Sequence, residues 1–178
     1  MHHALVAILV FCLIAFALTL GAWAFTAWLA PGRRTLRALT RILGAPPEVW
    51  TIAAPRSQGA GMRLGDRRLA VVRGVGDAGL VYDLIELIGV ELIFDGQVAA
   101  RMFRGEPRKA LDQISPQAQR VMLRLVFDDV RDPEFELELL NPNDLAARYP
   151  PDPSAAVQEG RRWFARLEAV LRQSGSRD

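Results

Sequence analysis

The chain has 178 residues, of which 51% are hydrophobic, and its 22 basic residues nearly balance its 20 acidic ones. All 20 acidic residues and 18 of the basic ones lie in residues 45–178, so this part is close to neutral and lacks the basic surface typical of nucleic-acid binding. The histidines of the chain are His2 and His3, and its one cysteine is Cys12. Residues 45–178 therefore offer no Ser-His, Cys-His or zinc chemistry, and no disulfide can form within the chain.

An uncharged, apolar run extends from Ala4 to Ala30 without Asn, Gln or Pro. At about 1.5 Å per helical residue it reaches about 40 Å, which exceeds the roughly 30 Å hydrocarbon core of a bilayer. A cleaved signal would have a basic start and a shorter apolar core, a buried soluble helix would show a polar stripe, and an interfacial helix would have a charged face. We therefore expect residues 1–30 to form a single tilted transmembrane helix.

Four arginines follow the apolar run, at Arg33, Arg34, Arg37 and Arg41. Because cytoplasmic flanks carry the Lys/Arg excess, we expect the N-terminus outside and the C-terminal domain in the cytoplasm. The same arginines are candidate lipid-interface residues. Leucines share one side of residues 31–44, which predicts a basic amphipathic juxtamembrane helix. It either lies along the inner leaflet or contributes only these topology-determining charges.

Residues 45–63 contain prolines and glycines and are expected to form a linker with one short strand at 49–53. Beyond it, alternating apolar residues predict a strand at 68–73, whereas 79–86 fits either a helical turn or a strand. The best local signal is the dipeptide Asp95-Gly96 between the runs GVELIF and QVAARMF. Both residues of a type I′ turn need positive φ, so this dipeptide predicts a β-hairpin.

Residues 106–119 are polar and are expected to form an exposed loop. A second hairpin is predicted from strands at 120–127 and 134–140, in which alternate glutamates of the second strand form a face that is either solvated or meets a cationic partner. A helix should then begin after Asp152 as N-cap, with Pro153 in its first turn and an apolar stripe that includes Trp163 and Leu167. This pattern predicts a domain at 64–174 and a tail at 175–178.

A family resemblance rests on three stretches: LIGVELIFDG at 87–96, LRLVFDD at 123–129 with Asp132-Pro133 and FEL, and AVQEGRRWFARLEAVL at 156–171. Together they resemble a family of bacterial membrane-anchored domains in which a hairpin with an acidic Asp-Pro turn precedes a helix containing a Trp. The layout is similar to pleckstrin-homology-like (PH-like) domains. The resemblance implies an α+β fold, with a mainly antiparallel sheet or partly open barrel of five to seven strands closed by a C-terminal helix. It also implies scaffolding or recognition, not catalysis.

The remaining motifs do not predict an enzyme. Residues 128–132 read DDVRD, a pattern that holds magnesium diphosphate in helical prenyl-transferring enzymes, but here it lies between two β-runs and leads into Pro133. Aspartates in such a place are typical of a turn. The glycines of 59–61 and 74–76 lack the strand, helix and lysine context of a phosphate loop. We therefore expect no catalytic residue, no metal, no cofactor and no small-molecule substrate.

Two functions remain open on the sequence. The first is a membrane-tethered scaffold or accessory subunit that contacts another membrane protein or complex. The second is a membrane-surface sensor that binds anionic lipid. In either case the candidate binding loop, for lipid or for a protein partner, is the one that carries Arg101, Arg104, Arg108 and Lys109.

Overall fold

The computed structural model describes residues 15–16, 18–20, 31–53, 58–74, 79–110, 118–143 and 152–175. Most of the predicted transmembrane helix, residues 1–30, lies outside these ranges, as do residues 111–117 of the polar loop expected at 106–119. The described part of that loop includes the short strand Lys109–Ala110. Within the described ranges, none of the helices combines the length and the apolar character needed to cross a bilayer.

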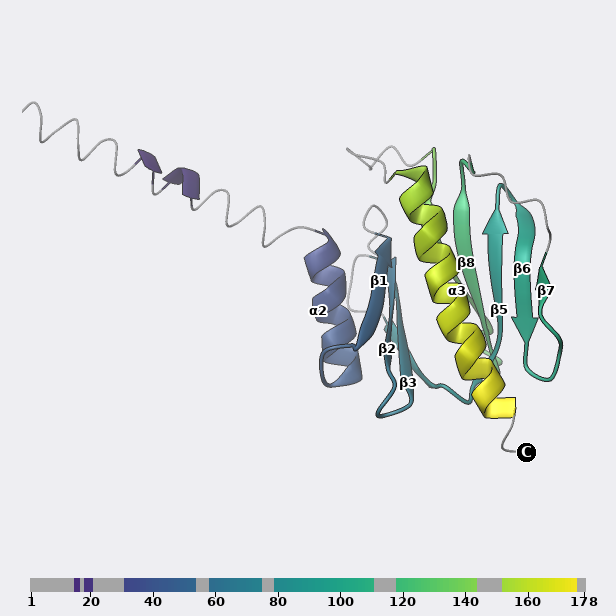
Figure 1. Ribbon diagram of the computed structural model, residues 1–178. Coiled ribbons are helices and arrows are strands. Elements are labelled where there is room, and N and C mark those ends of the chain that lie inside the picture. The colour runs from purple at the N-terminus through teal and green to yellow at the C-terminus, as the bar shows by residue number, and fades with distance from the viewer. Residues whose placement is uncertain are drawn as a thin grey trace, which may run out of the picture.

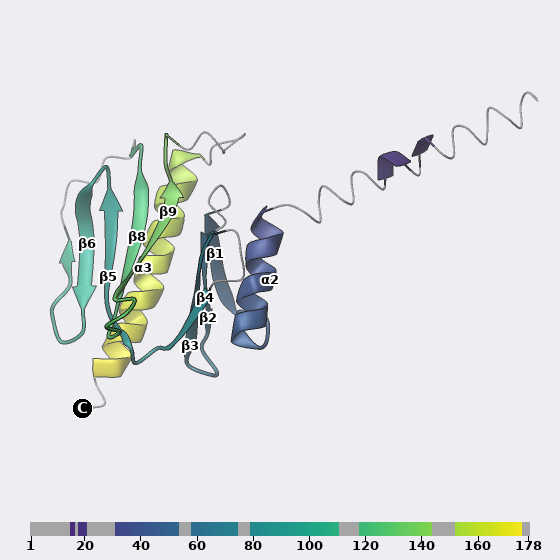
Figure 2. The ribbon, with the colours of Figure 1, turned by 180° about the vertical axis from the view of Figure 1, so that it is seen from behind.

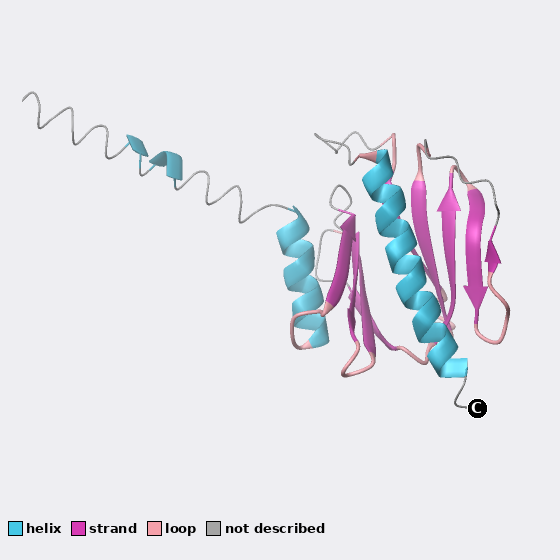
Figure 3. Ribbon diagram, viewed as in Figure 1, coloured by secondary structure: helices cyan, strands magenta, loops and turns pink. Residues whose placement is uncertain are grey.

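Nine strands in the described residues form two antiparallel sheets (Figures 1 and 3). Sheet A has the order β1-β2-β3-β4, built from Val49–Ala53, Gln58–Arg63, Arg68–Arg73 and Gly79–Asp83. Sheet B has the order β7-β6-β5-β8-β9, built from Lys109–Ala110, Gln97–Phe103, Leu87–Phe94, Val121–Phe127 and Glu134–Leu140. The helices are α2, Pro31–Leu43, and α3, Pro153–Gly175.

The predicted α+β class with antiparallel strands and a C-terminal helix is confirmed. The strand count of five to seven was too low, and the two sheets do not join into a closed barrel. The short strand expected at 49–53 is confirmed as β1, but the linker expected at 45–63 is wrong in part, because it also contains β2. Strand β2 escaped prediction because Gly59 and Gly61 have low strand propensity.

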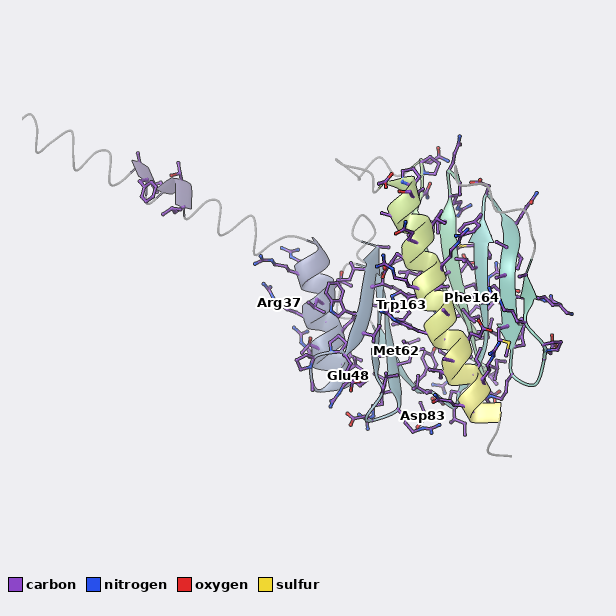
Figure 4. The ribbon with its side chains drawn as sticks, viewed as in Figure 1. Arg37, Glu48, Met62, Asp83, Trp163 and Phe164 are labelled. Atoms are coloured by element: carbon purple, nitrogen blue, oxygen red, sulfur yellow. The ribbon has the colours of Figure 1, made fainter. Side chains whose placement is uncertain are left out.

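The main core lies between the two sheets and is completed by α3, which crosses the inner face of sheet B on the side of sheet A (Figures 1 and 2). Trp163 is fully buried and Phe164 is 2% exposed. Figure 4 shows Trp163 on the side of α3 toward sheet A and Phe164 on the side toward sheet B. At Gly160, a Cβ would come within 2.8 Å of Leu92 Cδ1, so glycine permits the close approach of α3 to β5.

The other face of sheet A is covered by α2. Leu39 and Leu43 are 0% and 2% exposed and form a second cluster with Ala70 and Val72 of β3. The apolar side of α2 is thus occupied by protein, while its arginines point outward. Residues 31–44 were expected either to lie along the inner leaflet or only to supply charges that determine topology. The packing of α2 against sheet A disfavours the first role, because the apolar side of the helix is already buried.

Glycines of sheet A make room for α2. A Cβ on Gly59 would come within 2.7 Å of Thr35 Cγ2, and one on Gly61 within 3.1 Å of Pro47 Cβ. On Gly79 it would meet Ile42 Cδ1 at 2.2 Å and the Val71 carbonyl oxygen at 2.9 Å. Gly59 and Gly61, which make β2 difficult to predict from sequence, therefore also allow α2 to lie close to sheet A.

Gly59→Ala should lower the free energy of unfolding by about 1–3 kcal/mol, because it overpacks this contact. Adding Thr35→Ser removes the clashing methyl and keeps the hydroxyl, so the two changes should couple by at least about 0.5 kcal/mol in urea unfolding. Gly65→Ala is the control, since its Cβ would lie 3.6 Å from Glu48 Oε1, an ordinary contact. Strict additivity of the two changes would contradict the proposed clash.

Both predicted hairpins are present. Asp95 and Gly96 have φ of 50° and 83°, as a type I′ turn requires, and Phe94 pairs with Gln97 across it. Asp95 also accepts hydrogen bonds from the N–H groups of Gln119 and Arg120 through Oδ1, which fixes the entry into β8. The second hairpin, β8–β9, is also confirmed, and 79–86 resolves into β4 and a turn.

The N-cap predicted for the C-terminal helix is confirmed at Asp152. Its Oδ2 accepts hydrogen bonds from the Ser154 hydroxyl and, at 3.3 Å, from the Ala155 N–H. The hydrogen bond from Ser154 is the main reason that the pKa of Asp152 lies below its usual value, and the backbone N–H groups add to this shift. The Asp152 carboxylate thus caps the exposed first turn of α3.

A polar seam joins the two sheets at the β8–β9 turn. Tyr82 of β4 stacks on Phe127 with ring centroids 3.8 Å apart, and its hydroxyl donates to the Asp132 carbonyl oxygen at 3.2 Å. Arg73 of β3 forms an ion pair with Asp132 at 2.9 Å. In the same turn Asp129 Oδ1 accepts the Arg131 N–H at 2.8 Å. The aspartates at 128–132 therefore include residues that hold the turn and the seam.

The seam predicts a loss of stability at alkaline pH. Burial, and then the carboxylates of Asp129 and Asp132, raise the pKa of Tyr82 above its ordinary 10.0. Its contribution to stability is therefore complete below pH 10 and declines as the pH rises through the folded-state pKa. Urea unfolding at about pH 9 and about pH 11 should show a steeper decline for the natural chain than for Tyr82→Phe. Equal declines would contradict the assignment.

Candidate functional site

The four cations of the predicted lipid or partner loop are not gathered into one patch. The Arg104 guanidinium donates to the carbonyl oxygens of Ile85, in the turn between β4 and β5, and of Leu87, the first residue of β5. Arg108 pairs with Glu168 of α3 at 3.3 Å and lies 5.4 Å from the Phe164 ring centroid. These two arginines thus make contacts that link the loop to the β4–β5 turn and to α3, and a role of the loop in binding lipid or a partner stays a prediction.

The other two cations belong to a charged ladder on sheet B. Across the strands the register places five residues in one row: Lys109, Arg101, Glu91, Arg124 and Glu136. Arg124 is 2.9 Å from both Glu91 and Glu136. Burial alone would lower the pKa of Arg124, but the hydrogen bond to Glu136 and the surrounding carboxylates outweigh it and raise that pKa. Lys109 and Arg101 therefore flank an internal network.

The glutamate face of β9 is likewise used within the chain. Glu138 is 7% exposed, and its Oε1 accepts a hydrogen bond from Arg120 Nε at 2.8 Å. Glu136 belongs to the charged ladder. Solvation or a cationic partner were the two expected fates of this face. Glu134 and Glu136 are exposed, as expected for a solvated face, and they also pair with Arg124 of β8. Arg124 lies in register with Glu136, whereas Arg120, the residue before β8, pairs with the buried Glu138.

The four arginines of the predicted lipid interface are all exposed and lie on α2. Arg37, which Figure 4 labels on the outer side of this helix, and Arg41 line an open groove of about 540 Å³ with Trp50 of β1. Trp50 is 47% exposed. The groove is wide and shallow, and its arginines also make contacts within the chain. The structure thus keeps these four residues together on one helix.

A better-formed cleft, which no sequence pattern predicted, opens between sheet A and the C-terminal half of α3. Its volume is about 520 Å³, within the range of sites that hold a small ligand or a few side chains. The apolar part of its lining includes Val49, Met62, Leu84 and Val170, and the charged part is Arg67 and Arg166. Figure 4 labels Met62 in the space between sheet A and α3.

Local chemistry fixes the wall that carries Arg67. This residue has φ of 55° in the β2–β3 turn, its N–H donates to the Leu64 carbonyl oxygen at 3.3 Å, and its carbonyl oxygen accepts the Leu84 N–H at 2.8 Å. Arg63 neutralises the neighbouring Asp66 at 2.8 Å. Two backbone hydrogen bonds therefore fix the turn that carries Arg67, and the neighbouring Asp66 carboxylate pairs with Arg63 and not with Arg67.

Both charged side chains that line the cleft are arginines. Arg67 and Arg166 form no ion pair with any residue in the part of the chain that the structure describes. No carboxylate belongs to the lining. Two guanidinium groups beside an apolar floor are suited to a ligand that carries apolar groups and a carboxylate or another planar anion.

The described residues contain no group of three His, Cys, Asp or Glu side chains arranged to hold a metal ion. The cleft itself offers arginines, amides and apolar groups, which bind and orient a ligand. Sequence reasoning missed it because one wall is β2 and its turn, which fall in and beside the supposed linker. The other wall showed one weak signal, since Arg166 adjoins the apolar stripe of α3 at Leu167 and Val170.

Comparisons with models of protein families, with curated proteins and with solved structures found no match to this chain. A function for the protein must therefore be inferred from its own residues and their geometry.

Proposed function

We propose that this protein is a membrane-tethered, non-catalytic interaction module that acts as a scaffold or accessory subunit of a membrane complex. In this proposal residues 1–30 cross a bacterial inner membrane and the domain lies in the cytoplasm. The PH-like resemblance belongs to the same proposal.

The observation that carries the proposal is the packing of α2. This helix begins at Pro31, directly after the uncharged run that ends at Ala30, and buries Leu39 and Leu43 against sheet A. A tether that continues into a packed helix positions its domain at a fixed distance from the bilayer, whereas a flexible linker would let the domain move freely. Fixed placement suits an accessory subunit that must meet one neighbour.

The contacts of the basic loop support a protein partner over the lipid-sensor alternative. Arg104 and Arg108, two of the four candidate lipid-binding cations of this loop, already bind backbone carbonyls and Glu168. An anionic lipid would have to compete with these internal contacts. The cleft beside α3, in contrast, has apolar surface and two arginines outside any ion pair among the described residues.

Fractionation of cells that express the full chain with a C-terminal tag tests the tether. The protein should remain in membranes after carbonate extraction, dissolve in mild detergent and resist protease added to intact spheroplasts. A matched chain that lacks residues 1–30 should leave the membrane fraction. Release by carbonate, or digestion beyond Gly44 from outside, would overturn the tether or its orientation.

Affinity purification in mild detergent tests the scaffold role. The full chain should recover a membrane protein in near-equal amount, identified by mass spectrometry. Recovery of no partner, together with binding of the full chain to added anionic vesicles, would favour the sensor instead.

A further inference from the structure

We infer that the cleft between sheet A and α3 binds an acidic, apolar peptide segment of a cytoplasmic protein partner. The inference rests on the proposed function for the compartment of the partner, but the chemistry of the cleft stands on its own. It assigns a binding site and the class of its ligand.

The lining determines the chemistry of the ligand. Val49, Met62, Leu84 and Val170 form an apolar floor, and the volume of about 520 Å³ has room for a few side chains. Arg67 and Arg166 contribute two positive charges, with no carboxylate among the lining residues to offset them. Removing apolar side chains from water and pairing a carboxylate with guanidinium groups both favour binding of a peptide in which apolar and acidic residues alternate.

The place of the cleft in the fold favours a protein partner over a lipid. Helix α2 runs from Pro31 to Leu43, about 20 Å at the helical rise. Strand β1 begins shortly after α2 ends, and Val49 at its start pairs with Met62 next to the β2–β3 turn. The cleft therefore lies at the end of sheet A where α2 finishes, away from Pro31 (Figure 1). With the tether entering at Pro31, this end faces the cytoplasm.

The binding experiment uses the purified full chain in mild detergent and a fluorescein-labelled hexapeptide library in which Leu, Ile, Val or Phe alternates with Glu or Asp. The comparison library has Gln or Asn in place of the acids. The acidic library should bind at least about tenfold more tightly, since charge-assisted hydrogen bonds to arginine are lost in the amide library. Equal binding of the two libraries, or no binding of either, would overturn the inference.

Three variants locate the site. Arg67→Gln combined with Arg166→Gln keeps long polar side chains, removes both charges and should abolish the preference for the acidic library. Ala169→Phe narrows the cleft from an exposed lining position and should weaken binding of both libraries. Arg161→Gln removes an exposed charge of α3 outside the cleft and should change nothing. Unchanged binding by the double variant and by Ala169→Phe would place the site elsewhere, against the inference.

Vesicles rich in phosphatidylglycerol separate the lipid alternative from the peptide. They should not displace the acidic library from the full chain, and displacement that depends on Arg67 and Arg166 would overturn the inference in favour of lipid. The peptide assay requires no membrane orientation. If the protease experiment failed while peptide binding succeeded, the tether or its orientation would be wrong and the cleft assignment would remain.

Discussion

Trp163→Ala should lower the free energy of unfolding by about 3–5 kcal/mol, the typical effect of truncating a buried Trp. The Trp163 side chain is 0% exposed in the main core, so its loss leaves a cavity there. Its Nε1 has no hydrogen-bond partner among the described residues, so nearly all of the expected effect comes from packing. Urea unfolding of the full chain in mild detergent, followed by circular dichroism, measures it.

Trp50→Ala is the matched control for Trp163→Ala. Trp50 is 47% exposed at the side of α2, so its truncation should change the free energy of unfolding far less. Similar losses in the two variants would show that Trp163 does not occupy the centre of the core.

Leu39→Ala should lower the free energy of unfolding by about 2–5 kcal/mol, because Leu39 is 0% exposed between α2 and sheet A. The change tests whether α2 is an integral part of the domain. Arg34→Ala, on the exposed side of the same helix, should stay within about 0.5 kcal/mol of the natural chain. A loss below about 1 kcal/mol for Leu39→Ala would mean that α2 is only loosely attached.

The packing of α2 also affects truncation. Residues 45–178 alone would expose Ala70 and Val72, which α2 covers, and would lack the helix that Gly59 and Gly79 accommodate. We expect a chain that begins at residue 45 to bind the hydrophobic dye ANS more strongly than the full chain. Experiments on the isolated domain should therefore retain residues 31–44, and equal dye binding by the two chains would contradict this view.

Local sequence signals predicted the elements whose formation depends on neighbours in the chain. Asp95-Gly96 specified a hairpin because few other dipeptides accept positive φ at both positions, and Asp152 with Pro153 marked the start of α3. Strand β2 and the division into two sheets were not predictable in this way. They depend on the contact of Gly59 and Gly61 with α2, which involves residues more than ten positions away.

The candidate site illustrates the same limit. Arg104 and Arg108 formed a basic cluster in the sequence, yet their partners are Ile85, Leu87 and Glu168, which only the folded chain brings near them. Conversely, the two arginines of the cleft are 99 positions apart, at 67 and 166, and no local pattern relates them. A cluster of charges in the sequence predicts a charged binding surface only when those charges find no partners within the folded chain.

The row of charges from Lys109 to Glu136 also constrains how sheet B can assemble. If β8 slipped by two residues along β5, Arg124 would face Gly89 or Ile93 instead of Glu91, and the buried Glu91 carboxylate would lose its ion pair with Arg124. A slip by one residue would turn every core side chain of the strand outward. Both effects thus disfavour a wrong alignment of β8. This matters because β8 pairs with β5 although β6 and β7 lie between them in the sequence.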